Sequence, residues 1–111
     1  MTNLERFEIE LGDMSSKIDH DTKIVYLMEA DLDFNSEYIK ENKVNIYQAT
    51  LSFLNSLANN PQAMKTFRTD DLTISSFAEN IQNRIEQLEQ SIRKMKIEQK
   101  NKSDFFMLFN N

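Results

Sequence analysis

The chain has 111 residues, the length of a single domain, and at this size folding buries only about 60 to 65% of the unfolded chain's surface. Its net charge of −5 argues against a protein that binds the phosphate backbone of nucleic acids, because such proteins carry a basic excess. The absence of cysteine excludes disulfides, thiolate catalysis and cysteine-based zinc sites, and it fits a reducing compartment.

The charge is unevenly distributed along the chain. Residues 1–42 hold eleven acidic and four basic side chains, whereas residues 82–102 hold six basic and three acidic ones. No apolar stretch approaches the roughly 20 residues that span a bilayer, and the start lacks the layout of a signal peptide. We therefore expect a cytoplasmic protein without a membrane span. Its abundant Asn, Lys and Ile are typical of AT-rich genomes, such as those of low-GC bacteria, their phages or plasmids.

The fold class follows from the scarcity of turn residues. One glycine and one proline leave few places where a multi-stranded sheet could turn. The composition therefore predicts an all-α protein, a small helical bundle with a long C-terminal coiled-coil-like helix. We divide this single domain into an N-terminal helical region (1–75), a long amphipathic helix (76–102) and an apolar C-terminal tail (103–111).

The N-terminal segment fits two interpretations. Spacings of three and four residues predict a helix whose apolar face is formed by Leu4, Phe7, Leu11, Met14 and Ile18, with only Ile9 off that face. Over residues 7–11, however, apolar and charged residues alternate as in a half-buried strand, and Gly12-Asp13 is a turn signal. With 24–28 as the partner strand, the alternative fold is α+β with an N-terminal β-hairpin at about 5–28. We favour the helix.

Two further helices are predicted in the middle of the chain. The first covers about 36–59, and its apolar stripe is wide enough for contacts with more than one neighbour. Pro61 ends it, because proline disfavours helix at the preceding residue. Pro61 also suits the first turn of a short helix that carries Ala63, Met64 and Phe67. Residues 68–75 are expected to connect this helix to the last one.

The last helix has the clearest pattern. Ser76 and Glu79 match a capping box at its start. Its apolar residues then follow at the spacing of a coiled-coil seam: Ile81, Ile85, Leu88, Ile92 and Met95. Such a seam packs either inside the domain or against a second copy, and we expect a homo-oligomer, with a dimer favoured.

The tail ends in a run of large apolar residues. We expect partner docking through Phe105, Phe106, Leu108 and Phe109, since aromatic and aliphatic side chains make good anchors in grooves. The alternative is a lid that folds back on its own chain. A membrane anchor is disfavoured, because five residues offer little apolar area and the net charge opposes anionic lipids.

One segment partly matches a calcium-binding loop. Asp31, Asp33 and Asn35 occupy positions 1, 3 and 5 of an EF-hand-like loop. Ser36 stands where the loop needs glycine, and Asn42 stands where it needs a bidentate glutamate. We therefore interpret the segment as a polar loop in which Asn35 or Ser36 caps the next helix.

Catalytic groups are scarce. His20 is the only imidazole, so it alone is available to activate a nucleophilic serine or to join a metal shell. We interpret Asp19-His20-Asp21 as a loop in which one aspartate caps a following helix. The sequence thus predicts no enzyme, no catalytic residue, no cofactor and no metal.

We expect a non-enzymatic protein–protein interaction module, such as an adaptor, chaperone or assembly factor, that associates through its last helix and the FFMLF tail. Its partner is expected to be a protein and not a nucleic acid. The alternative is an acidic inhibitor or decoy of a nucleic-acid-binding protein, encoded by a phage or mobile element, which presents carboxylates in place of phosphates.

Overall fold

The computed structural model describes the backbone of residues 1–109 and the side chains of residues 1–102. Its elements are α1 (Asn3–Leu11), the 3-10 helix η1 (Gly12–Lys17), α2 (His20–Glu29), the 3-10 helix η2 (Lys40–Asn42), α3 (Lys43–Ala58), α4 (Pro61–Phe67) and α5 (Ile74–Phe109). Over the backbone that is described there is no strand, only an isolated bridge between Thr2 and Glu37. The all-α prediction is confirmed, and the alternative hairpin at 5–28 is wrong.

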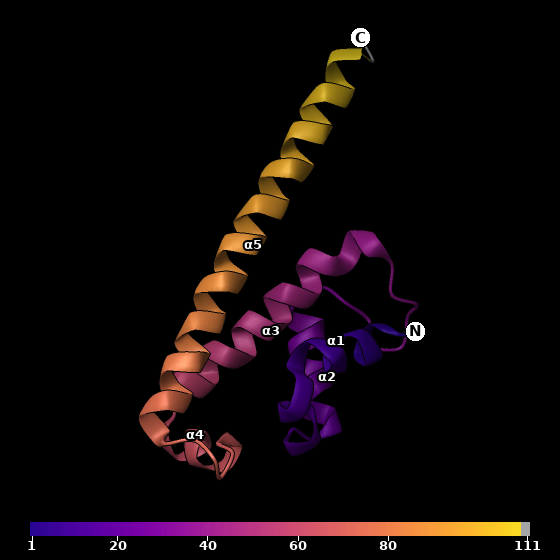
Figure 1. Ribbon diagram of the computed structural model, residues 1–111. Helices are drawn as coiled ribbons and strands as arrows, with labels where there is room; N and C mark the ends of the chain where they lie inside the picture. Colours follow the sequence, from indigo (N-terminus) through magenta and orange to yellow (C-terminus); the bar gives the residue numbers. More distant parts are fainter. Residues whose placement is uncertain (110–111) are drawn as a thin grey trace.

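Helix α3 is the centre of the fold and packs against α1, α2, α4 and α5 (Figure 1). Its buried residues spread over more than one face: Val44, Ile46, Ala49, Thr50, Phe53, Leu54 and Leu57. The hydroxyl of buried Thr50 donates to the Ile46 carbonyl at 2.9 Å, so its polar atom is satisfied inside the helix. The predicted contact of this helix with several neighbours is confirmed.

The N-terminal segment is helical because its two ends are capped. The Thr2 hydroxyl accepts from the Glu5 amide, and the Glu5 carboxylate accepts in turn from the Thr2 amide, which forms a capping box. Gly12, with a φ of 62°, then ends α1 in a conformation that favours glycine. Phe7 is buried and Ile9 is 59% exposed, as the helical interpretation predicted. The predicted continuation of this helix through Met14 to Ile18 is wrong, because α1 ends at Leu11 and the 3-10 helix η1 follows.

The second predicted helix begins seven residues later than expected, at Lys43 instead of Ser36. The segment before it is held as a turn by Asp33, whose carboxylate accepts from the Asn35 amide and the Ser36 hydroxyl. Such local bonds compete with helix formation. The prediction that Asn35 or Ser36 caps this helix is therefore wrong, since Asp33 engages both.

The next helix, α4, agrees with its prediction. Pro61 occupies its first turn, and the side-chain oxygen of Asn60 caps it by accepting from the Ala63 amide at 3.1 Å. Met64 is buried, and Phe67 packs edge-on against Phe53 of α3 with 5.5 Å between ring centroids. The short helix thus covers one end of α3.

The last helix begins at Ile74 and its backbone continues to Phe109, beyond the predicted end at residue 102. Its first turn is capped by Thr73, whose hydroxyl oxygen accepts from the Ser76 amide at 3.1 Å. The predicted Ser76–Glu79 box at this position is wrong, because Ser76 already lies inside the helix. Thr73 is the capping residue because it directly precedes the first helical residue. From there its hydroxyl can accept from an amide of the first turn that has no partner within the helix.

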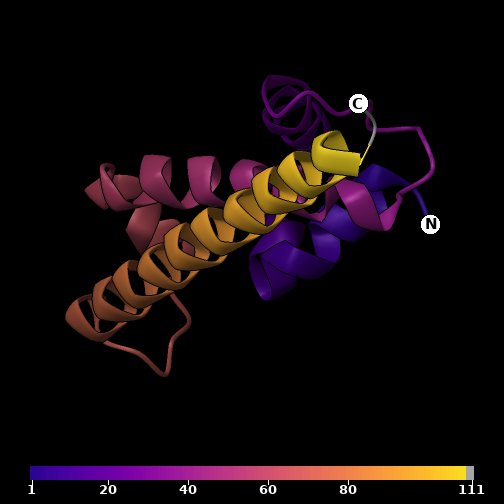
Figure 2. The same ribbon diagram turned by 90° about the horizontal axis from the view of Figure 1, so that it is seen from above.

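This long helix makes the molecule elongated. Its 36 residues correspond to about 54 Å, whereas the 16 residues of α3 correspond to about 24 Å. The radius of gyration is 16.2 Å, against about 13 Å for a compact domain of this length. In Figure 1 the C-terminal half of α5 accordingly extends past the other helices. In Figure 2, which is seen from above, the same helix runs diagonally across the others.

The cap at the start of α5 gives a direct test. We expect Thr73→Ala to lower the free energy of unfolding by about 1 kcal/mol, because the Ser76 amide loses its acceptor. Ser76→Ala is the control and should change it by less than about 0.5 kcal/mol. Urea unfolding followed by circular dichroism measures both, and the reverse order of the two effects would restore the predicted box.

Candidate interaction surface

The five residues of the predicted seam lie on the face of α5 that packs against α3. Ile81, Ile85 and Leu88 belong to the main hydrophobic core, and Leu88 is fully buried. Ile92 is also buried, at 8% exposure, whereas Met95 is only half-buried. Most of the seam thus has its packing partners within the same chain, and its burial does not require a second copy.

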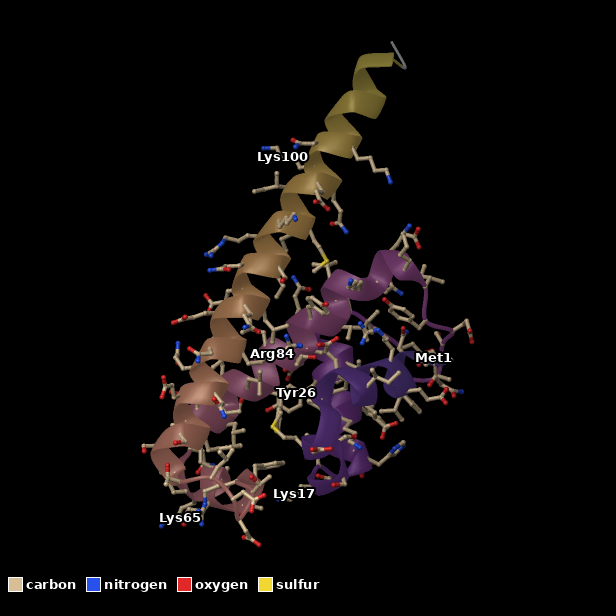
Figure 3. All side chains as sticks on the ribbon, in the orientation of Figure 1. Met1, Lys17, Tyr26, Lys65, Arg84 and Lys100 are labelled. Carbon is tan, nitrogen blue, oxygen red and sulfur yellow. The ribbon has the colours of Figure 1, made fainter. Side chains whose placement is uncertain are left out.

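An ionic contact ties α5 to the N-terminal helix. Glu10 of α1 accepts from Arg84 of α5 and from Arg6 at 3.0 Å. The Glu10 side chain is only 13% exposed, so solvent screens these contacts less than it screens surface ion pairs. Figure 3 shows Arg84 in the first third of α5, where the helix passes the N-terminal elements.

Beyond this region α5 forms an exposed basic arm, which we define as residues 93–102. All of its side chains are exposed except half-buried Met95. It carries five basic residues and one acidic residue, and Ile97 is 59% exposed. Lys100 projects outward from the helix in Figure 3. The arm is therefore a surface element with a charge opposite to that of the whole chain.

A groove of about 380 Å³ lies where the arm and the start of α3 diverge. The residues that shape it include Lys40, Glu41, Lys43, Val44, Met95 and Glu98. A second hollow of about 220 Å³ adjoins it, sharing Lys43, Met95 and Glu98 and adding Tyr47 and Lys94. The Lys43 ammonium lies 5.6 Å from the centroid of the Tyr47 ring, within reach of a cation–π contact. The groove combines apolar lining residues with a basic rim, and sequence reasoning did not find it.

The predicted docking residues Phe105, Phe106, Leu108 and Phe109 lie outside the described side chains. The backbone of α5 nevertheless remains helical through Phe109. The tail is thus a continuation of the arm and not a separate extended segment.

The acidic end of the molecule presents a mixed surface on α2. Asp21, Val25, Met28 and Glu29 are all exposed, with values of 43% for Val25 and 62% for Met28. Their spacing places them on one side of the helix, opposite buried Lys23 and Leu27. Two apolar side chains are therefore flanked by two carboxylates.

Two acids in and beside the partial calcium-loop pattern have local structural partners. The Asp33 carboxylate holds the turn before α3, and Glu37 pairs with the N-terminal ammonium at 2.9 Å. Over the part of the chain that the structure describes, no group of three or more His, Cys, Asp or Glu residues is placed to hold a metal ion. The partial calcium-loop pattern corresponds here to a turn.

The single histidine opens α2. Its ring packs edge-on against Phe34 with 5.8 Å between centroids. The neighbouring Asp19 caps the helix by accepting from the Thr22 amide and hydroxyl. The predicted capping role of an aspartate here is confirmed for Asp19.

Comparisons of the chain with family models, with curated proteins and with solved structures found no match. Among the described residues, no helix is both long enough and apolar enough to cross a membrane. Proposals about function therefore rest on the surfaces described above.

The cap at Asp19 predicts a dependence of stability on pH. Hydrogen bonds from the Thr22 hydroxyl and amide hold the pKa of Asp19 below its ordinary value of 3.8. This contribution to stability is present above pH 3.8 and is lost as the pH falls through the lower pKa of the folded protein. Asp19→Asn still caps but does not titrate, so urea unfolding midpoints between about pH 6 and 2.5 should fall less steeply for this variant. If the midpoints of the two proteins fell equally steeply with pH, Asp19 would not be the titrating cap.

The burial of the seam also predicts how its residues affect stability. Leu88→Ala should lower the free energy of unfolding by about 2–5 kcal/mol, because it leaves a cavity beside α3. The exposed Ile97→Ala is the matched control on the same helix and should stay within about 0.5 kcal/mol. The loss for Leu88→Ala should be the same at low and high protein concentration. A loss that depends on concentration would instead place Leu88 between two copies.

Proposed function

We propose that the protein is a non-enzymatic protein–protein interaction module and that the end of α5 is its docking element. The observation that carries this proposal is the exposed basic arm, which projects from the core and leads into the FFMLF run. A helix that extends beyond its own domain contributes little to that domain's core. Its sequence is therefore free to serve contacts with another molecule.

The composition of the tail supports a protein groove as its binding site. Phe, Met and Leu side chains are typical anchors of helices that dock into apolar grooves, and the lysines of the arm suit an acidic rim on the partner. The uninterrupted helix favours docking over the lid, since a lid would need a break in α5 to turn back towards α3. Figure 1 shows α5 running away from the other helices towards its C-terminal end.

We propose a non-enzymatic function because the few side chains that could act in catalysis are engaged in structural contacts. His20 packs on Phe34, and Asp19 is engaged in capping. The acids of α1 that lie nearest the core, Glu8 and Glu10, are paired with Lys23 and Arg84. These contacts stabilise the fold and leave no assembled nucleophile and base among them.

The acidic decoy remains a competing proposal with a different signature. A decoy uses dispersed carboxylates, so its affinity for a basic partner falls steeply with salt and survives loss of the tail. Apolar docking depends weakly on salt and is lost with the tail. The pairing of Glu8 and Glu10 with cations reduces the acidic surface that a decoy would offer.

Truncation tests the docking role. We expect a chain ending at Ser103 to keep the free energy of unfolding of the full chain within about 0.5 kcal/mol, because the described core ends near Ile92. In cells that carry the natural gene, a photo-crosslinking amino acid at position 106 should capture another protein. Crosslinking through position 109 should be abolished by Phe105→Ser with Phe106→Ser.

A crosslinker in place of exposed Arg93 is the matched control, since it lies on the same helix but before the tail. A loss of several kcal/mol on truncation, with crosslinks only inside the chain, would show that the tail is an intramolecular lid. A crosslinked partner that binds the truncated chain equally well would favour the decoy.

A further inference from the structure

The groove of about 380 Å³ between α3 and the arm is open to solvent along the start of both elements. Its apolar lining consists of half-buried Met95 and of Val44, which is 7% exposed. The polar residues around the two adjoining hollows include four lysines and two glutamates: Lys40, Lys43, Lys94, Lys102, Glu41 and Glu98. An occupant that fits this arrangement has apolar side chains at its centre and an excess of carboxylates at its edges.

The protein carries a surface of this kind. On the exposed side of α2, Val25 and Met28 lie between Asp21 and Glu29. These four residues span about two turns of helix, or about 12 Å, with the carboxylates at the two ends. Within one chain α2 packs on α1 and on α3, and neither Val25 nor Met28 is covered by those contacts.

We propose that the groove between α3 and the arm binds the exposed side of α2 from a second copy of the chain. In this contact Val25 and Met28 pack on half-buried Met95 and on the small exposed part of Val44, while Asp21 and Glu29 face the lysines of the rim. A helix placed in an apolar groove is a common mode of recognition between proteins. The inference rests on the proposed function as an interaction module, and it names one of the partners.

Two copies can satisfy each other reciprocally, because each chain carries one groove and one α2 surface. Reciprocal contacts of this kind close around a twofold axis and give a dimer. The buried seam leaves Ile81, Ile85 and Leu88 engaged in the core, so self-association through other surfaces is consistent with the intact fold. The docking surfaces of the dimer also leave the tail available to a different protein.

A charge-swap experiment tests the pairing. One variant reverses the α2 surface (Asp21→Lys with Glu29→Lys), and the other reverses the groove (Lys40→Glu with Lys43→Glu). All four side chains are exposed, so both variants should fold, which circular dichroism checks. By sedimentation equilibrium we expect the wild-type chain to dimerise, and each variant alone to dimerise at least about tenfold more weakly.

The mixture of the two variants is the decisive measurement. Lysines on α2 of one chain then meet glutamates in the groove of the other, and the reverse contact keeps its natural charges. A one-to-one heterodimer should form with an affinity close to that of the wild type. Val25→Ser with Met28→Ser keeps all charges and should also weaken dimerisation at least about tenfold. Asp70→Lys with Asp71→Lys, an equal change of charge at exposed residues between α4 and α5, is the control and should leave it unchanged.

The outcomes separate this inference from the proposed function. A monomeric wild-type chain, or variants that dimerise as well as the wild type, would overturn it. Loss of the dimer in the chain ending at Ser103 would also overturn it, because that chain retains every described groove residue; the dimer would then use the tail. A dimer that survives the truncation, combined with no partner crosslinked at position 106, would leave this inference standing and refute tail docking.

Discussion

The packing of α3 against α5 is the contact on which the rest of the structure depends. The two helices share one apolar interface, yet α3 has 16 residues and α5 has 36. Because the rise per residue is fixed, the shorter helix covers less than half of the longer one. The fold therefore has a buried part of α5, which includes Leu88, and an exposed part at residues 93–102, in which only Met95 is half-buried.

The same difference in length between α3 and α5 produces the groove. Val44 and Met95 lie where the two helices separate; Val44 remains only 7% exposed, whereas Met95 is half-buried. Lysines gather there because the start of α3 and the basic arm of α5 meet at this point. The acidic residues, in contrast, are concentrated in the elements that precede α3. One molecule thus carries two surfaces of opposite charge: exposed Val25 and Met28 lie between the carboxylates of α2, and half-buried Met95 lies among the lysines of the groove.

Ion pairs also connect the N-terminal helices to each other and to α5. Glu10 joins α1 to α5 through Arg84, and Lys23 joins α2 to α1 through Glu8 at 2.8 Å. The Lys23 side chain is only 9% exposed, which places its charge beside the core, where an unpaired ammonium would be costly. These contacts hold the acidic end in place and leave the outer side of α2 free.

The sequence by itself determined the helical class, the break at Pro61 and the apolar face of the last helix, because these depend on local spacing and on the geometry of single residues. It also favoured a helix over a hairpin at residues 5–28, since Phe7 and Leu11 lie on one helical face and Ile9 does not. The start of α3 and the cap of α5 were mispredicted, because Asp33 and Thr73 offered local acceptors that compete with the expected pattern. Only the tertiary structure decided that the seam from Ile81 to Ile92 is buried inside one chain and that a groove opens beside Met95, because both depend on where two helices of unequal length diverge.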